Sequence, residues 1–318
     1  MKRRRRRLVE GGLGYYHVMS RTVNGESLFG EVEKEVLRRM LWQVAEFSGV
    51  RVVTYALMSN HFHLLVEVPP KGEISDAELV RRYGVLYPKV SPWQPLSASA
   101  LERLLATPSG EPVRRQLVSR MHDVSWLMKT LKQRFSLWYN RTHDRYGPLW
   151  SDRFKSVLVE GEKWALQTVA AYIDLNAVRA GLVEDPKDYR YCGYGEAVGG
   201  GVRAREGLSV LGGNLSGYRQ TLYGVGSETK EGKATVSREE ALRVLEKEKG
   251  NLPLTTLLRC RVRYFTDGRI LGSEAFVREQ TKAQPPPASG RPPGPTPMKG
   301  ANWRGLSTLG GLRKNLFG

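Results

Sequence analysis

Two histidines separated by a single residue have the clearest chemical potential in this sequence. His61-Phe62-His63 opens a segment of alternating residue types, which predicts a strand. Side chains alternate between the faces of a strand, so both imidazoles project the same way, roughly 6–7 Å apart, and could share one metal ion. Phe62, Leu64, Val66 and Val68 lie on the opposite face. Two surface histidines without a ligand would show the same spacing.

The histidine count indicates which kind of metal site is possible. The chain contains five histidines, and the other three are His17, His122 and His143. A closed structural zinc site is not expected from so scattered a set. An open site completed by oxygen ligands and water fits better, and it favours Mg²⁺ or Mn²⁺ acting on a phosphate.

A helix expected over residues 163–180 offers a nucleophile. Thr168, Tyr172, Asn176 and Arg179 follow one another at helical spacing and share a face separate from the apolar stripe. A phenol attacks a phosphate poorly unless a cation or a base helps it ionise, and a divalent ion with an arginine would stabilise the phosphate charge. Attack would leave a phosphotyrosine and a free 3′-hydroxyl, so rejoining needs no ATP. Taken alone, the helix is more simply interpreted as carrying a tyrosine at the rim of the core.

The elements around these residues follow the order strand, helix, strand, strand, helix, strand, helix. The expected strands are 15–21, 52–58, 61–68 and 153–159, and the expected helices are 32–47, 124–138 and 163–180. Ser59-Asn60 forms the turn of a hairpin, and Gly181 ends the last helix in the left-handed conformation. This order predicts an α+β fold with an antiparallel sheet and flanking helices, most often the ferredoxin-like arrangement.

Composition divides the rest of the chain. Residues 69–112 are rich in Pro, Gly and Ser and lack a sustained period, so we expect a long surface insertion there. Clusters of glycine predict a linker, a capping box at Ser237 opens a small helical module, and a proline-rich tail is expected to be disordered. The expected parts are a catalytic domain at 1–195, a linker at 196–234, a module at 235–282 that could bind DNA, and a tail at 283–318.

The charge of the chain indicates its partners. The sequence has 50 Lys and Arg against 32 Asp and Glu, a formal charge of +18. Polyphosphate backbones are the commonest partners of such an excess, although a protein can simply be basic. Residues 2–7 are all positive with no apolar stretch after them, which excludes a secretory signal, and no apolar run could span a membrane. Cys192 and Cys260 are too few for a disulfide scaffold, so we expect a cytoplasmic protein. No small-molecule cofactor is expected.

Four motifs occur in order within residues 1–195. They are Tyr16-His17-Val18 with Ser20-Arg21, Met58-Ser59-Asn60-His61-Phe62-His63-Leu64-Leu65-Val66, Gly147-Pro148-Leu149-Trp150 with Arg153-Phe154-Lys155-Ser156, and Tyr172-Ile173-Asp174-Leu175-Asn176 through Arg179-Ala180-Gly181-Leu182-Val183. Together they make the chain resemble the REP-associated tyrosine transposases, bacterial members of the single-tyrosine, HUH-type DNA transposases. Four motifs in this order are far more specific than any one of them.

The resemblance implies roles for individual residues. His61 and His63 would be paired metal ligands, Asn176 the third protein ligand, and Tyr172 the nucleophile. It also implies a ferredoxin-like fold and single-stranded DNA near palindromic hairpins as the substrate, cleaved through a 5′-phosphotyrosine. The insertion and the segment from 235 to 280 depart from a minimal member, and Tyr264-Phe265-Thr266-Asp267-Gly268 is similar to an appendage of some larger relatives.

Candidate DNA contacts are chosen by position and charge only. They are Arg21, Lys129, Lys132, Arg153, Lys155 and Arg179. Arg259, Arg261 and Arg263 could add contacts, or could form a solvated basic face. Two other functions fit the same sequence, a domesticated DNA-binding protein that no longer cuts and a metal hydrolase that acts through water. The assembly is expected to be a monomer or a homodimer.

Overall fold

A mixed sheet forms the centre of the computed structural model, which describes residues 9, 11–91, 94, 96–223, 254–259, 262–282 and 294–309. Within these residues the strand order is β2-β3-β1-β4-β5-β7-β6. The strands are β1 (Gly14–Arg21), β2 (Arg51–Leu57), β3 (His61–Val68), β4 (Lys155–Val159), β5 (Ile270–Gly272), β6 (Thr296–Pro297) and β7 (Ser307–Leu309).

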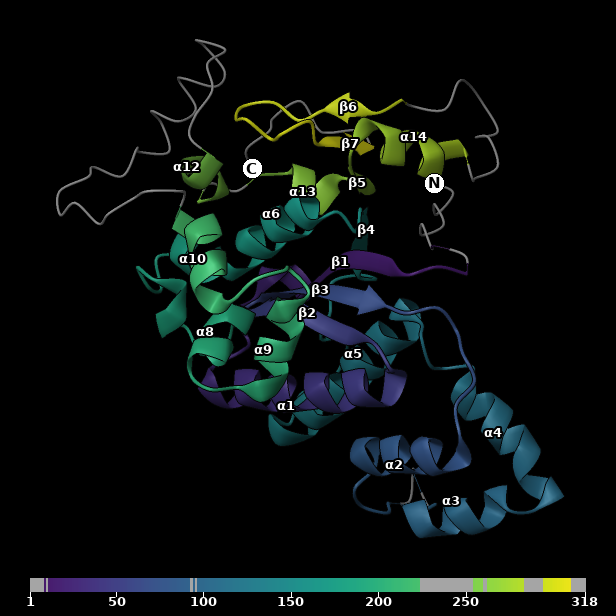
Figure 1. Ribbon diagram of the computed structural model, residues 1–318. Helices are drawn as coiled ribbons and strands as arrows, with labels where there is room; N and C mark the ends of the chain where they lie inside the picture. The colour runs from purple at the N-terminus through teal and green to yellow at the C-terminus, as the bar shows by residue number, and fades with distance from the viewer. Residues whose placement is uncertain are drawn as a thin grey trace.

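The first four strands confirm the ferredoxin-like core. All pairs among β2, β3, β1 and β4 are antiparallel, and Met58–Asn60 connect β2 to β3 as a hairpin. Helices α1 (Glu31–Ser48) and α5 (Val124–Thr142) pack together below the sheet in Figure 1. Helix α1 ends at Gly49, whose φ of 64° is the left-handed conformation that glycine adopts readily. The apolar side of each helix therefore packs against one face of the sheet.

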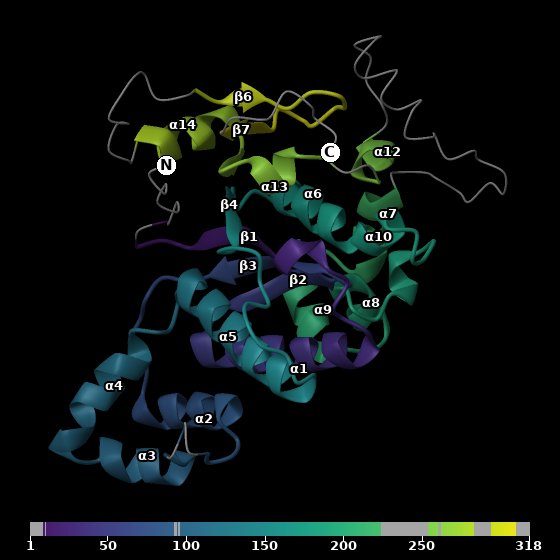
Figure 2. The same cartoon turned by 180° about the vertical axis from the view of Figure 1, so that it is seen from behind.

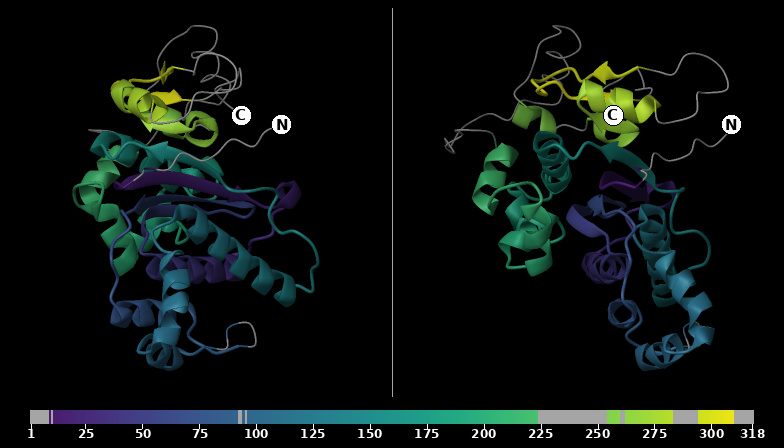
Figure 3. Two further views of the ribbon diagram at one scale, coloured as in Figure 1. Left: turned by 90° about the vertical axis from the view of Figure 1, so that its right-hand side faces the viewer. Right: turned by 45° about the vertical axis from the view of Figure 1, so that its right-hand side comes forward.

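The opposite face is covered by α6 (Lys163–Asp174), which a bend at Leu175 separates from the short α7 (Asn176–Arg179). Figure 3 shows the layers from two further sides, with α1 and the C-terminal elements on opposite sides of strands β1 to β3. Gly181 is left-handed, as expected, with a φ of 68°. Burial on both faces explains why almost every residue of β3 is buried.

The linker expected at 196–234 is wrong for its first part. Residues 193–223 form α8 (Gly193–Val198), α9 (Val202–Ser209) and α10 (Leu215–Tyr223). Helix α9 lies so close to the edge strand β2 that a Cβ on Gly207 would meet the carbonyl oxygen of Val52 at 2.2 Å. Glycine here permits close packing against a strand edge. The glycine clusters that predicted a linker, residues 199–201 and 212–213, lie just before and just after α9. Residues 224–234 lie outside the described part.

The surface insertion is helical. It contains α2 (Asp76–Leu86), α3 (Ala98–Leu105) and, at its end, α4 (Glu111–Val118), which together project away from the sheet (Figures 1 and 2). Ser75 and Ser97 cap the first two helices by accepting hydrogen bonds from Glu78 N and Ala100 N. These helices are too short to produce a sustained period. The remaining short turns are η1 (Val23–Gly25), η2 (Pro108–Gly110) and η3 (Pro186–Asp188).

The C-terminal elements extend the sheet instead of forming a separate helical module. We call residues 254–309, in their described parts, the C-terminal segment: it contains α12 (Leu254–Leu258), α13 (Tyr264–Asp267), β5, α14 (Glu274–Lys282), β6 and β7. Strand β5 pairs parallel to β4, so the whole sheet is mixed where an antiparallel one was expected.

The tail is ordered over residues 294–309, because Trp303, Leu306 and Leu309 are buried against the core. Disorder was therefore the wrong expectation for these residues. The capping box at Ser237 and the other residues of the tail lie outside the described part.

Candidate metal and nucleophile site

The histidine pair, His61 and His63, lies on one face of β3, as the spacing predicted. Their rings are 5.2 Å apart between centroids, and they stand opposite Arg21 and Met19 of β1. The face is not open, however, because α6 and the C-terminal segment cover it. His63 is only 2% exposed, whereas His61 at the end of the strand is partly accessible.

A third histidine belongs to the same cluster. His17 on β1 places its Nε2 2.8 Å from Nδ1 of His63, and its Nδ1 2.8 Å from the carbonyl oxygen of Phe265. Burial lowers the pKa of His17 to about 4, and burial followed by neighbouring positive groups lowers the pKa of His63 well below its usual value. Both rings are therefore neutral near pH 7, the form in which an imidazole binds a metal. Sequence reasoning missed His17 as a site residue, although a histidine among the apolar residues of β1 was a visible signal.

The predicted nucleophile lies beside this cluster. The ring centroid of Tyr172 on α6 is 6.1 Å from that of His63 and 6.2 Å from that of His17. The guanidinium carbon of Arg179 stands 4.1 Å from the centre of the phenol ring, a cation–π geometry. The side chain is 2% exposed, because the ring of Phe265 stacks on it at 4.4 Å.

The residues predicted to share a helix face with Tyr172 do not all lie on one continuous helix. Asn176 follows the bend after α6, and its amide nitrogen donates to the carbonyl oxygens of Ile173 at 3.1 Å and Tyr172 at 3.4 Å. The amide oxygen is thus the atom that could act as a ligand. Arg179 donates to the carbonyl oxygens of Tyr172 at 2.5 Å and Leu258 at 2.6 Å. Thr168 is buried and bonds to its own helix.

A buried carboxyl group positions α6. Asp174 accepts hydrogen bonds from the hydroxyl groups of Thr54 at 2.8 Å and Tyr218 at 2.6 Å, and from the backbone N–H of Tyr194 at 3.1 Å. These partners tie the end of α6 to β2, α8 and α10. Burial raises the pKa of Asp174 to about 6. No pattern in the sequence singles out this residue.

The donor atoms determine which metal site is possible. Among the described residues, no group of three or more His, Cys, Asp or Glu could hold an ion. The predicted set, the histidine pair with the amide oxygen of Asn176, would leave positions for water or for phosphate oxygens and stays a prediction. By its donor chemistry, such a set would suit an open Mg²⁺ or Mn²⁺ site and would not suit a closed structural zinc site.

The candidate DNA contacts divide between the two faces of the sheet. Arg21 stands opposite His61, Lys155 stands opposite Met19 on the face of His63, and the charges of Arg179 and Arg21 contribute to the lowered pKa of His63. Arg153 is exposed just before β4.

Two further candidates, Lys129 and Lys132, lie on α5 against the opposite face. There Lys132 donates to the carbonyl oxygen of Asp152 at 2.8 Å, and the Lys129 ammonium lies 4.3 Å from the centre of the Trp126 ring. The structure therefore does not bring these two lysines to the histidine pair.

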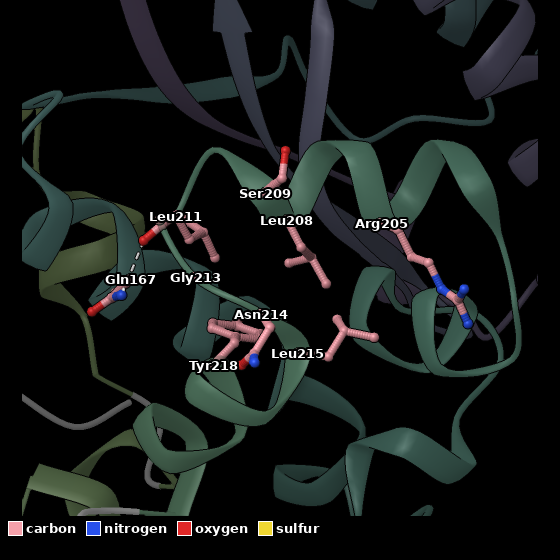
Figure 4. Close-up of a pocket in the computed structure, with 10 residues that line it drawn as sticks. Gln167, Arg205, Leu208, Ser209, Leu211, Gly213, Asn214, Leu215 and Tyr218 are labelled. Atoms are coloured by element: carbon pink, nitrogen blue, oxygen red, sulfur yellow. Dashed lines mark hydrogen bonds between the residues drawn. The ribbon is translucent and has the colours of Figure 1, made fainter.

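A cavity of about 240 Å³ lies away from the histidine pair, between α6, α9 and α10 (Figure 4). Gln167, Leu211 and Tyr218 are among its lining residues, and the amide nitrogen of Gln167 donates to the carbonyl oxygen of Leu211 at 3.0 Å. Its link to the site is indirect, through the hydrogen bond between Tyr218 and Asp174.

None of the helices in the described part combines the length and apolar character needed to cross a bilayer.

Part of this site lies in a segment that is similar to a known family. Residues 12–83 match the family model of IS200-like transposases, which confirms the resemblance over β1, α1, the β2–β3 hairpin and most of α2. The matched residues include His17, His61 and His63, while Tyr172 lies beyond them. A solved structure of a REP-associated tyrosine transposase bound to a REP hairpin is similar with 15% identity and a TM-score of 0.41, covering 64% of this chain and 88% of that one. No curated protein matches the chain.

Proposed function

We propose that this protein is a transposase that cleaves and rejoins single-stranded DNA near palindromic hairpins, with Tyr172 as the nucleophile. One observation carries the proposal: the phenol of Tyr172 lies beside His63 and beneath the guanidinium of Arg179. The family match over the histidine-bearing strands and the formal charge of +18 support a DNA substrate. Such a substrate would place the protein with the DNA in the cytoplasm.

The reaction exchanges one phosphoester for another. The Tyr172 oxygen forms a bond to the scissile phosphorus, the bond from phosphorus to the 3′ oxygen breaks, and the phenol proton is balanced by protonation of the departing 3′ oxygen. The products are a 5′-phosphotyrosine and a free 3′-hydroxyl. Attack by a 3′-hydroxyl on this intermediate reverses the exchange and joins the strands without ATP.

Different residues of the chain would bind the metal ion, stabilise negative charge and bind the DNA phosphates. His61, His63 and the amide oxygen of Asn176 would hold Mg²⁺ or Mn²⁺, whose chemistry is to polarise the scissile phosphate. Arg179 lies against the phenol ring and would stabilise negative charge that develops on the tyrosine and phosphate oxygens. Arg21, Lys155 and Arg153 would bind neighbouring phosphates along the edge of the same face.

The test uses labelled single-stranded hairpin DNA incubated with the full-length protein and Mg²⁺. A protein–DNA adduct that survives denaturation is expected from the wild type and not from Tyr172→Phe, which keeps the ring but removes the nucleophilic oxygen. Cleavage without an adduct would support a hydrolase that acts through water. Binding with neither product would support a domesticated DNA-binding protein.

A further inference from the structure

A chain of hydrogen bonds runs from the C-terminal segment into the histidine pair. It starts at the carbonyl oxygen of Phe265, which lies 2.8 Å from Nδ1 of His17, a residue 248 positions earlier in the chain. A carbonyl oxygen can only accept, so the hydrogen must be on Nδ1 of His17. A neutral imidazole carries one N–H, and therefore Nε2 of His17 has a lone pair and accepts.

The second link follows from the first. Nε2 of His17 lies 2.8 Å from Nδ1 of His63, and because His17 accepts here, His63 donates from Nδ1. The Nε2 atom of His63 then carries the lone pair. This is the tautomer that a histidine must adopt in order to bind a metal ion through Nε2.

The other histidine of the pair is fixed in the same tautomer by a different residue. The amide nitrogen of Asn60 donates to the carbonyl oxygen of Gly25 at 2.9 Å, which turns its amide oxygen toward His61. That oxygen lies 2.6 Å from Nδ1 of His61, so His61 donates from Nδ1, and in its neutral form the ring carries its lone pair on Nε2. Two independent contacts thus prepare the two rings in the same way.

We propose that His17 is a positioning residue that holds His63 in the Nδ1–H tautomer, and that the Phe265 carbonyl group in the C-terminal segment sets the direction of this chain. The inference rests on the proposed function only in taking the histidine pair as the metal ligands. On this inference the C-terminal segment helps to set the tautomer of a metal-binding histidine. All three histidines nevertheless lie within residues 12–83.

The first measurement is made on the metal-free full-length protein labelled with ¹⁵N-histidine. The chain has five histidines, so two-bond ¹H–¹⁵N correlation spectra can be assigned with single variants. We expect His17, His61 and His63 all to show the Nδ1–H pattern. A wild-type spectrum in which His63 carries its hydrogen on Nε2 would overturn the inference, whether or not any variant folds.

The second measurement compares two substitutions by Mn²⁺ binding, followed by electron paramagnetic resonance. His17→Leu removes the acceptor, and we expect affinity to fall by about 10- to 100-fold, the usual effect of losing a partner of a metal-binding histidine. His17→Gln places an amide oxygen near the position of Nε2, so affinity and the His63 pattern should stay close to the wild type. His143→Leu, which removes a histidine at the end of α5, is the matched control.

Equal losses in His17→Leu and His17→Gln would show that His17 acts only by packing, and wild-type affinity in His17→Leu would show that it has no role. Neither measurement depends on DNA cleavage. A protein with the expected tautomers that forms no DNA adduct would count against the proposed function alone. An adduct-forming protein with His63 in the other tautomer would count against this inference alone.

Discussion

The ring of Phe265 stacks on the ring of Tyr172 with 4.4 Å between centroids and 25° between planes. The first ring comes from α13 of the C-terminal segment and the second from α6, so the segment covers the proposed nucleophile. The backbone of the same residue, through its carbonyl oxygen, bonds to His17. Phe265 therefore combines two contacts that substitution can separate, because changing the side chain leaves the carbonyl group in place.

Substitution Phe265→Leu should speed adduct formation. Leucine fills much of the same volume but cannot stack, and an aromatic pair contributes about 0.5–1.5 kcal/mol. The phenol should then reach a phosphate more readily, and single-turnover rates of adduct formation should rise by about two- to tenfold. Phe276→Leu in α14 is the control, since it alters a partly buried ring elsewhere in the same segment. An unchanged or slower rate in Phe265→Leu would show that the stack does not restrict Tyr172.

Asp174 should make stability depend on pH. Burial raises its pKa in the folded protein to about 6 from the usual 3.8, so the folded state binds this proton more tightly than the unfolded state does. The resulting stabilisation is fully present below about pH 4 and is lost as the pH rises through about 6. Relative to Asp174→Asn, the wild type should lose about 2 kcal/mol of unfolding free energy between pH 4 and pH 7.5, measured with urea. Parallel pH curves for the two proteins would refute this account.

Lys155 should contribute to DNA binding through phosphate. It lies on the face of the histidine pair, and each neutralised phosphate of single-stranded DNA contributes about 0.7 to the slope of log affinity against log salt. Lys155→Ala should reduce the slope by about that amount. Lys129→Ala, on the opposite side of the sheet, should leave the slope unchanged. The same loss from both variants would mean that the DNA path is not confined to the face of the histidine pair.

Chelation should separate DNA binding from adduct formation. With excess EDTA we expect adduct formation to stop while hairpin DNA still binds, because the basic side chains do not depend on the ion. Added Mg²⁺ or Mn²⁺ should restore the reaction in the wild type but not in His61→Ala, and His122→Ala is the control for the loss of a histidine elsewhere. Full adduct formation in EDTA would remove the metal from the proposal.

The core of the fold could be predicted from the sequence because apolar residues recur at strand or helix spacing over long segments. Four strands and three helices lie within a few residues of their expected bounds, and the hairpin puts both imidazoles on one face. The expected order of strands also brings β1 beside β3. The contact between His17 and His63 could have been inferred from that order, had the histidine on β1 been considered with the pair.

The C-terminal segment could not be predicted, because its contribution depends on contacts between residues far apart in the chain. Strand β5 has only three residues, which is too short for a period, and its partner β4 lies more than a hundred positions earlier. Phe265 contacts His17 through a backbone carbonyl group, an atom that every residue has. The glycine clusters at 199–201 and 212–213 misled in the opposite direction, because the residues between them fold into α9, where Gly207 allows close packing against β2.

The most direct test of the proposed mechanism is to map the covalent bond. Wild-type protein is incubated with hairpin DNA and Mg²⁺, digested with protease and nuclease, and analysed by tandem mass spectrometry. We expect a nucleotide joined through its 5′ phosphate to the peptide that contains Tyr172, and no nucleotide on that peptide from Tyr172→Phe. A nucleotide attached to any other residue, or an adduct that persists in Tyr172→Phe, would contradict it.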